Sequence, residues 1–156
     1  MVLQCVYCSA TFDVIYDVMR VVLDTDVVVA GVLSPTGASR QLLIAAADRR
    51  FEILVSVPLT LEWEPVLKRP EILRAAKGSA DDMDVVLDQL AEVCVPVVLH
   101  FLWRPQSKDP DDDMVLETAI NGGADVIATF NVRHLAAAAM YFGVAVEQPS
   151  SLLRRM

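Results

Sequence analysis

The sequence predicts an α/β sandwich built around a mainly parallel sheet. Short apolar segments rich in β-branched residues alternate with longer segments of helical periodicity, which is typical of β–α–β units. Acidic or amide residues follow several of the predicted strands, as expected where the carboxyl ends of parallel strands form a crevice. The chain has 156 residues, of which 54% are hydrophobic, so it is long enough for one domain with a substantial core.

The first half of the chain contains two predicted strands, each followed by a helix. Both strands are short and apolar, as expected of strands buried on both faces. The first predicted helix has one apolar face, and Pro70 is expected to end the second. These elements are residues 21–26, 37–50, 51–56 and 59–67, in the order strand, helix, strand, helix.

The second half repeats this alternation. Residues 79–82 read Ser-Ala-Asp-Asp, a variant of the capping box that begins a helix. Pro96 favours an edge position or an interruption for the strand that follows, and two glycines at 122 and 123 end the next helix. The predicted elements are helices at 79–92, 111–121 and 134–142 and strands at 93–101, 125–129 and 144–147.

The first 18 residues fit this pattern poorly. Cys5 and Cys8 form a Cys-x-x-Cys pair that supplies half of a zinc site, but no second pair of ligands follows at suitable spacing. We therefore expect residues 1–18 to be an N-terminal extension that packs loosely. Residues 19–150 are expected to form the domain, and residues 151–156 a C-terminal tail.

Charge and hydropathy limit the class of protein. The net charge of −8 argues against broad coating by nucleic acid, so any nucleic-acid substrate requires a local basic rim or metal ions. No apolar run reaches the roughly 18–20 residues that span a bilayer. Three cysteines do not form a disulfide framework. Without a signal-peptide pattern, we expect a cytoplasmic protein.

Acidic residues gather where predicted strands end and helices begin. Asp24 closes the first strand, Glu62 lies early in a helix, and Asn131 follows a later strand. Converging carboxylates repel one another unless a hard divalent cation neutralises them, and Mg²⁺ prefers oxygen ligands. The pattern therefore predicts a metal-dependent site for phosphate chemistry. The helix near residue 111 begins with four further acids, Asp109, Asp111, Asp112 and Asp113.

Four segments, in order along residues 19–150, resemble those of PIN-domain nucleases. The first reads Leu-Asp-Thr-Asp-Val, where the family usually has Asp-Thr-Asn at a strand end. The second has a Glu five residues before a Leu. The third resembles the Asp-Pro-x-Asp segment of a subgroup of toxin components, and the fourth, Thr-Phe-Asn, resembles the family's Thr-Gly-Asp. These segments are residues 23–27, 56–67, 108–113 and 129–131.

The resemblance implies a three-layer α/β/α nuclease that cuts RNA with Mg²⁺ or Mn²⁺. It also implies a homodimer and pairing of the protein, as a toxin, with an antitoxin. Asp24, Glu62 and Asp112 match the metal ligands, and Asn131 completes the catalytic set. Asp26 replaces the usual Asn and Asn131 a frequent Asp. These two departures leave open the geometry of a second metal ion.

Other charged residues near these motifs have both functional and structural interpretations. Asp26, Asp109 and Asp113 are additional candidate acids, although acids in a first helical turn also stabilise the helix. Both tryptophans are expected to pack in the structure rather than stack on bases. Cations that flank the acids are candidates to bind RNA phosphate, with ordinary surface charge as the alternative. These cations are Arg104, Lys108 and Arg133.

Two other functions remain open at this stage. Residues 24–28 also fit the Asp-x-Asp-x-Val opening of HAD-type phosphatases. In such an enzyme Asp24 would be the nucleophile and Asp26 a general acid. That function needs a Ser or Thr and a Lys, for which Ser56 and Lys108 are the candidates, but Lys108 lies within the acidic segment. The non-enzymatic alternative is a PIN-like domain that binds RNA or a partner without cutting.

Overall fold

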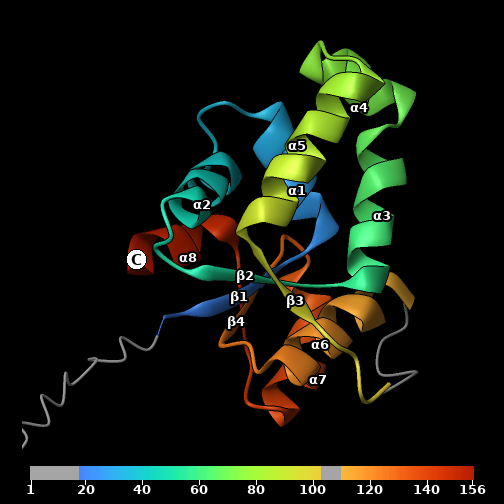
Figure 1. The fold of residues 1–156 in the computed structure, drawn as a ribbon. Coiled ribbons are helices and arrows are strands. Elements are labelled where there is room, and N and C mark those ends of the chain that lie inside the picture. The colour runs from blue at the N-terminus through green and yellow to red at the C-terminus, as the bar shows by residue number, and fades with distance from the viewer. Residues whose placement is uncertain (1–17, 103–109) are drawn as a thin grey trace, which may run out of the picture.

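Short β-branched segments form the parallel sheet that the sequence predicts. The computed structural model describes residues 18–102 and 110–156, and in these residues five parallel strands have the order β3-β2-β1-β4-β5. Helices cover both faces of the sheet (Figure 1), which confirms the α/β/α sandwich. The strands are β1 (Arg20–Leu23), β2 (Glu52–Ser56), β3 (Cys94–Val97), β4 (Val126–Ala128) and β5 (Ala145–Glu147).

The helices form two layers around the sheet. α6 and α7 lie on one face, and α1, α2, α3 and α5 lie on the other (Figure 1). α6 contacts β1, β2, β3 and β4, so it covers the centre of its face. The helices are α1 (Thr25–Leu33), α2 (Ala38–Ala47), α3 (Val57–Leu67), α4 (Pro70–Ala76), α5 (Ala80–Val93), α6 (Pro110–Gly122), α7 (Val132–Tyr141) and α8 (Pro149–Arg155).

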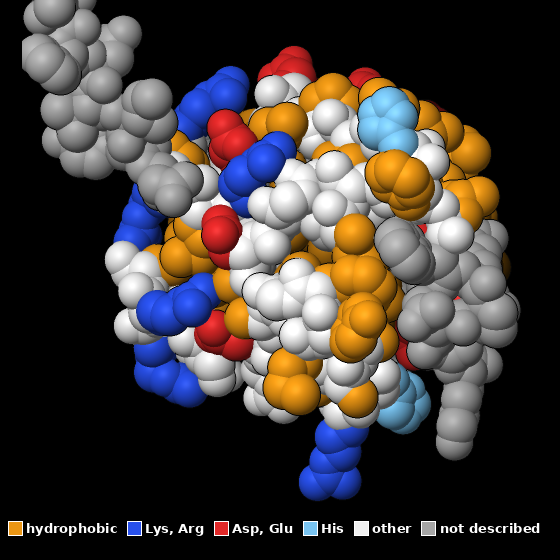
Figure 2. All heavy atoms as spheres, turned by 90° about the horizontal axis from the view of Figure 1, so that it is seen from below, with side chains coloured by type: hydrophobic (Ala, Val, Ile, Leu, Met, Phe, Trp, Pro, Cys, Tyr) orange, Lys and Arg blue, Asp and Glu red, His pale blue; other side chains and the backbone are white. Residues whose placement is uncertain are grey.

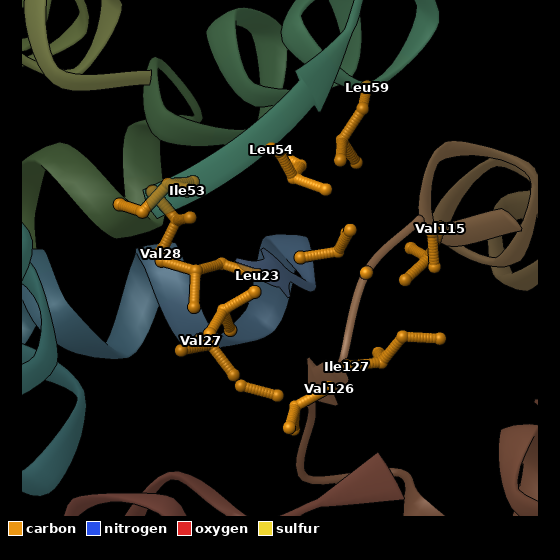
Figure 3. Packing of buried hydrophobic residues seen from close by; sticks show 14 of the residues in the cluster. Leu23, Val27, Val28, Ile53, Leu54, Leu59, Val115, Val126 and Ile127 are labelled. Atoms are coloured by element: carbon orange, nitrogen blue, oxygen red, sulfur yellow. The ribbon is translucent and has the colours of Figure 1, made fainter. Parts of the chain in front are cut away.

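The core follows from the burial of the central strands on both faces. Val21, Val22 and Leu23 of β1 have no exposed surface, as expected of a parallel strand between two helical layers. Figure 3 shows side chains of α1, α3 and α6 meeting those of β1, β2 and β4 in one apolar cluster. This packing fixes the carboxyl ends of β1 and β4 next to each other.

The first predicted strand is wrong at its C-terminal end, because α1 begins at Thr25. Residues 25–33 are apolar and β-branched, and their propensity favours a strand. The Asp24 carbonyl nevertheless accepts the N–H groups of Val27 and Val28, at 3.0 and 3.2 Å. Both valines are fully buried. Tertiary burial therefore overrides local propensity here.

Pro70 begins a helix as well as following one. α3 ends at Leu67, as predicted, but α4 starts directly at Pro70 with Arg69 as its N-cap. Proline suits the first helical position because the N–H it lacks would have no partner within the helix. The expectation that Pro70 marks only a stop was therefore incomplete.

The capping box at the start of α5 is confirmed. The Asp82 N–H donates to the Ser79 hydroxyl at 3.2 Å, and the Ser79 N–H donates to the Asp82 carboxylate at 2.7 Å. The Ser79 N–H and the Ser79 hydroxyl both donate to the Asp82 carboxylate and lower the pKa of Asp82. The edge position inferred from Pro96 is also confirmed, since β3 is an outer strand of the sheet. It is shorter than predicted, ending at Val97.

Most of the segment expected to be a C-terminal tail belongs to α8. Leu152 is fully buried, and α8 packs against α2. The extension expected at the N-terminus falls, apart from Val18, outside the described residues. Within the described part of the chain, no single helix is long and apolar enough to cross a membrane. By length and composition alone, α1 and α2 could do so as a pair bent by 97°.

Candidate functional site

The end of β1 places Asp24 at the carboxyl edge of the sheet. Its N–H donates to the carbonyl of Ala128 at 3.0 Å, which ties the end of β1 to the end of β4. The Asp24 side chain makes no capping bond to α1. Its Oδ2 instead accepts a hydrogen bond of 2.6 Å from the Thr129 hydroxyl. Because Thr129 is fully buried, this bond orients the Asp24 carboxylate.

Asp26, in the first turn of α1, lies close to other acids. Its Oδ2 accepts the backbone N–H of Phe130 at 3.3 Å. Its pKa is nevertheless raised to about 6, first by the burial of its carboxyl group and then by the negative charge of Asp24. Asp112 contributes in the same direction. The carboxylates of β1, α1 and α6 are therefore near enough to repel one another.

One cavity of about 580 Å³ gathers these groups. The sequence-predicted residues come from different elements: Glu62 from α3, Asp112 from α6, and Asn131 from the N-cap of α7. The Asn131 side chain makes no capping bond, so its carboxamide is not used to start the helix. The predicted residues that line the cavity are Asp24, Asp26, Glu62, Asp112 and Asn131.

Other predicted residues are not placed in this cavity. Asp113 is buried in α6 and does not line it, and Arg133 lines a neighbouring hollow. Asp109, Arg104 and Lys108 lie outside the described residues, so their predicted roles stay predictions.

Arg69 is a cavity residue that sequence reasoning missed. It lies at the N-cap of α4 and lines the same cavity as Glu62 of α3. The available signal was Pro70, because a proline favours the first position of a helix and so makes Arg69 its N-cap. Apolar side chains of Val66 and Ile72 complete this wall. A partly apolar lining strengthens the electrostatic interactions of the charged groups.

His134 adds a second missed contact. Its Nδ1 lies 3.8 Å from Oδ2 of Asp112. The imidazole is exposed, whereas the Asp112 side chain is almost buried. His134 lies in the first turn of α7, shortly after Asn131. The point at which β4 ends therefore determines where both Asn131 and His134 lie. The contact joins α7 to the acidic wall on α6.

The donor set fits a hard divalent cation by its chemistry. All the predicted ligands are carboxylate or carboxamide oxygens, the donors preferred by Mg²⁺ and Mn²⁺. Burial first, and then the negative charges of Asp24 and Asp112, raise the pKa of Asp26, and a bound cation would oppose both effects. Among residues 18–102 and 110–156, no three His, Cys, Asp or Glu side chains form a ready-made ligand cluster. The oxygens thus share a cavity without closing around one point.

Comparison with known proteins agrees with this architecture. The family model described as PIN domain matches residues 20–133, from β1 to the start of α7. No curated protein shows significant sequence similarity to the chain. The matched segment is well over half of the chain and includes Asp24, Glu62, Asp112 and Asn131. PIN domains are generally nucleases, and this chain belongs to the PIN domain family.

Proposed function

We propose that the protein is a metal-dependent endoribonuclease that uses Mg²⁺ or Mn²⁺. The observation that supports this most directly is the shared cavity, which collects acids from β1, α1, α3 and α6. Repulsion among acids costs stability, so such a cluster favours a functional role over a structural one. A bound divalent cation would activate water and stabilise the charge that develops on a phosphodiester.

Each residue of the cavity has a distinct role in this proposal. Asp24, Glu62 and Asp112 hold the cation, and the Asn131 carboxamide oxygen holds the cation or water. Thr129 positions Asp24, because its hydroxyl donates to the Asp24 carboxylate at 2.6 Å. Asp24 itself lines the cavity.

Arg69 is the proposed contact for the RNA phosphate at the cavity. A polyanion approaching this set of acids is repelled, and the net charge of −8 offers no compensating field. On the face shown in Figure 2, Lys and Arg side chains are interleaved with acidic ones and form no broad basic surface. Contact with RNA must then depend on local cations. Arg69 lines the cavity itself and carries a guanidinium suited to phosphate.

The phosphatase alternative is less well supported. Its candidate Ser56 is almost completely buried, and its hydroxyl lies 2.7 Å from that of Thr118. Ser56 does not line the acidic cavity. The family match also favours a nuclease. A domain that binds RNA or a partner without cutting stays the second candidate.

The toxin role is the finer part of the proposal. Its support is the resemblance of residues 108–113 to a subgroup of toxin components. The acidic cavity is suited to an Arg or Lys side chain from an antitoxin, which would compete with the cation for the carboxylates. A homodimer is proposed on the same resemblance.

The test is cleavage of a fluorescent single-stranded RNA by the full-length protein. We expect cleavage with Mg²⁺ or Mn²⁺, none with EDTA, and no release of phosphate from a small monoester. Arg69→Gln should raise KM with little change in kcat. Arg74→Gln is the matched control, because Arg74 lies on the same helix but does not line the cavity. Monoester hydrolysis with intact RNA would make the proposal wrong.

A further inference from the structure

A second hollow adjoins the acidic cavity. It has a volume of about 530 Å³ and lies between the start of α7, the end of β5 and the start of α8. This size is within the range of about 300–1,000 Å³ that is usual for small-molecule sites. The two hollows share Phe130 and Asn131. A ligand could therefore occupy both by passing over the loop between β4 and α7.

Phe130 presents an aromatic ring at this boundary. Half of its surface is exposed, so part of the ring is open to a ligand in the hollow that it lines. Its backbone is held in place, since its N–H donates to Asp26 at 3.3 Å. The neighbouring Asn131 N–H donates to the Thr129 hydroxyl at 2.9 Å. The loop that carries the ring is therefore tied to the acids of the first cavity.

The charges in the second hollow differ from those in the acidic cavity. Its carboxylate, Glu147, lies 3.2 Å from the Arg155 guanidinium, so that charge is compensated. Arg133 lines the hollow and adds a positive charge. Gln148 and Ser151 also line it and supply amide and hydroxyl groups. A polar hollow with a positive charge beside a compensated carboxylate suits a nucleobase and its phosphate better than a metal ion.

We propose that this second hollow binds one base of single-stranded RNA, stacked on Phe130, next to the phosphate in the acidic cavity. The amide of Gln148 and the hydroxyl of Ser151 are available to the edge of the base, and Arg133 to the adjoining phosphate. Exposed aromatic rings beside cations are how proteins bind unpaired bases. This inference rests on the proposed ribonuclease function and specifies its substrate as an unstacked strand.

The experiment measures binding of two oligomers of equal length by fluorescence anisotropy in Ca²⁺, which neutralises the acids of the cavity, and a gel after each titration verifies that the oligomers are intact. One is a single-stranded oligoadenylate, and the other has abasic sites throughout. Phe130→Ala should weaken binding of the oligoadenylate by about 5- to 150-fold, the range for one stacked base. It should change binding of the abasic oligomer by less than twofold. Phe130→Trp should restore the oligoadenylate affinity.

Tyr141→Ala is the matched control, because Tyr141 is an aromatic residue at the end of α7 with 85% of its surface exposed and lines neither hollow. It should leave both affinities unchanged. If Phe130→Ala lowers the affinity for both oligomers equally, or for neither, the proposed base site is wrong. The hollow would then be a candidate site for a protein partner. A failure of the ribonuclease proposal would give a different result. Base-dependent binding without any cleavage in Mn²⁺ would contradict the ribonuclease function and leave the base site intact.

Discussion

Asp26 and Asp82 both lie in the first turn of a helix, yet their pKa values move in opposite directions. Asp26 belongs to α1 and Asp82 to α5. The N–H and hydroxyl of Ser79 donate to Asp82 at 2.7 and 2.8 Å and lower its pKa. Burial and the charge of Asp24 raise the pKa of Asp26 to about 6, despite a hydrogen bond from Phe130.

The difference separates an acid whose charge stabilises a helix from one whose charge is disfavoured by its surroundings. The start of a helix favours a carboxylate in either case. At α5 that preference is joined by a reciprocal cap, so the ionised Asp82 stabilises the helix. At α1 the preference of the helix start for a carboxylate is outweighed by burial of the Asp26 carboxyl group and by the charges of Asp24 and Asp112. Keeping these acids together weakens the fold, which is the pattern expected where ligand binding compensates for it.

The largest expected effect is on catalysis. Asp112→Asn should lower kcat/KM for RNA by more than about 100-fold, since removing even an outer contact of a metal ligand often costs 10- to 100-fold. The melting temperature in EDTA should not fall, because the substitution relieves repulsion. Asp88→Asn, at an exposed position of α5, is the control and should cleave normally. Near-normal cleavage by Asp112→Asn would remove Asp112 from the site.

A smaller effect is expected at the cap of α5. Ser79→Ala removes the hydroxyl that accepts the Asp82 N–H and donates to its carboxylate. The free energy of unfolding should fall by about 1 kcal/mol, as for other N-caps, and kcat/KM should not change. Because the pKa of Asp82 is lower in the folded state, the stability that the cap contributes depends on pH. It is fully present above the pKa that Asp82 has in the unfolded chain, and it is lost as the pH falls through the pKa that Asp82 has in the folded protein. Urea denaturation at several pH values measures both.

The smallest effect is a gain in stability from Asp26→Asn in EDTA. A folded pKa of about 6, above the model-compound value of 3.8, means that the wild type loses stability as pH rises through this range. The variant cannot ionise there, so its advantage should grow between pH 4 and 7. The carboxyl group is partly desolvated, but residue 26 as a whole is exposed, so solvent screening limits the gain to on the order of 1 kcal/mol. An advantage independent of pH would refute the repulsion between acids.

The strand and helix order was predictable because the apolar pattern changes period along the chain. α1 as a whole was not predicted, since residues 25–33 carry strand-like valines that become helical only through burial against the core. Pro70 was ambiguous for a related reason, as proline both follows helices and begins them. α8 was missed because its seven residues give too short a period to recognise.

The acids of the cavity were predictable from one rule, that parallel strands end at the same edge of a sheet. Asp24 and Asn131 follow from it directly, and family spacing selected Glu62 and Asp112. Arg69 could not be found in this way, because its place depends on how α4 turns back after α3. Phe130 was missed because its interest lies in its exposed position, which the residue type alone does not reveal.

The central claim is that the acids of the cavity bind a divalent cation, and calorimetric titration with Mn²⁺ tests it most directly. Asparagine at position 24 can still accept the Thr129 hydrogen bond, so Asp24→Asn removes the charge and keeps the geometry. We predict saturable binding to the wild type and to Asp88→Asn, and binding at least tenfold weaker to Asp24→Asn. Equal Mn²⁺ affinity in the wild type and Asp24→Asn would contradict the account.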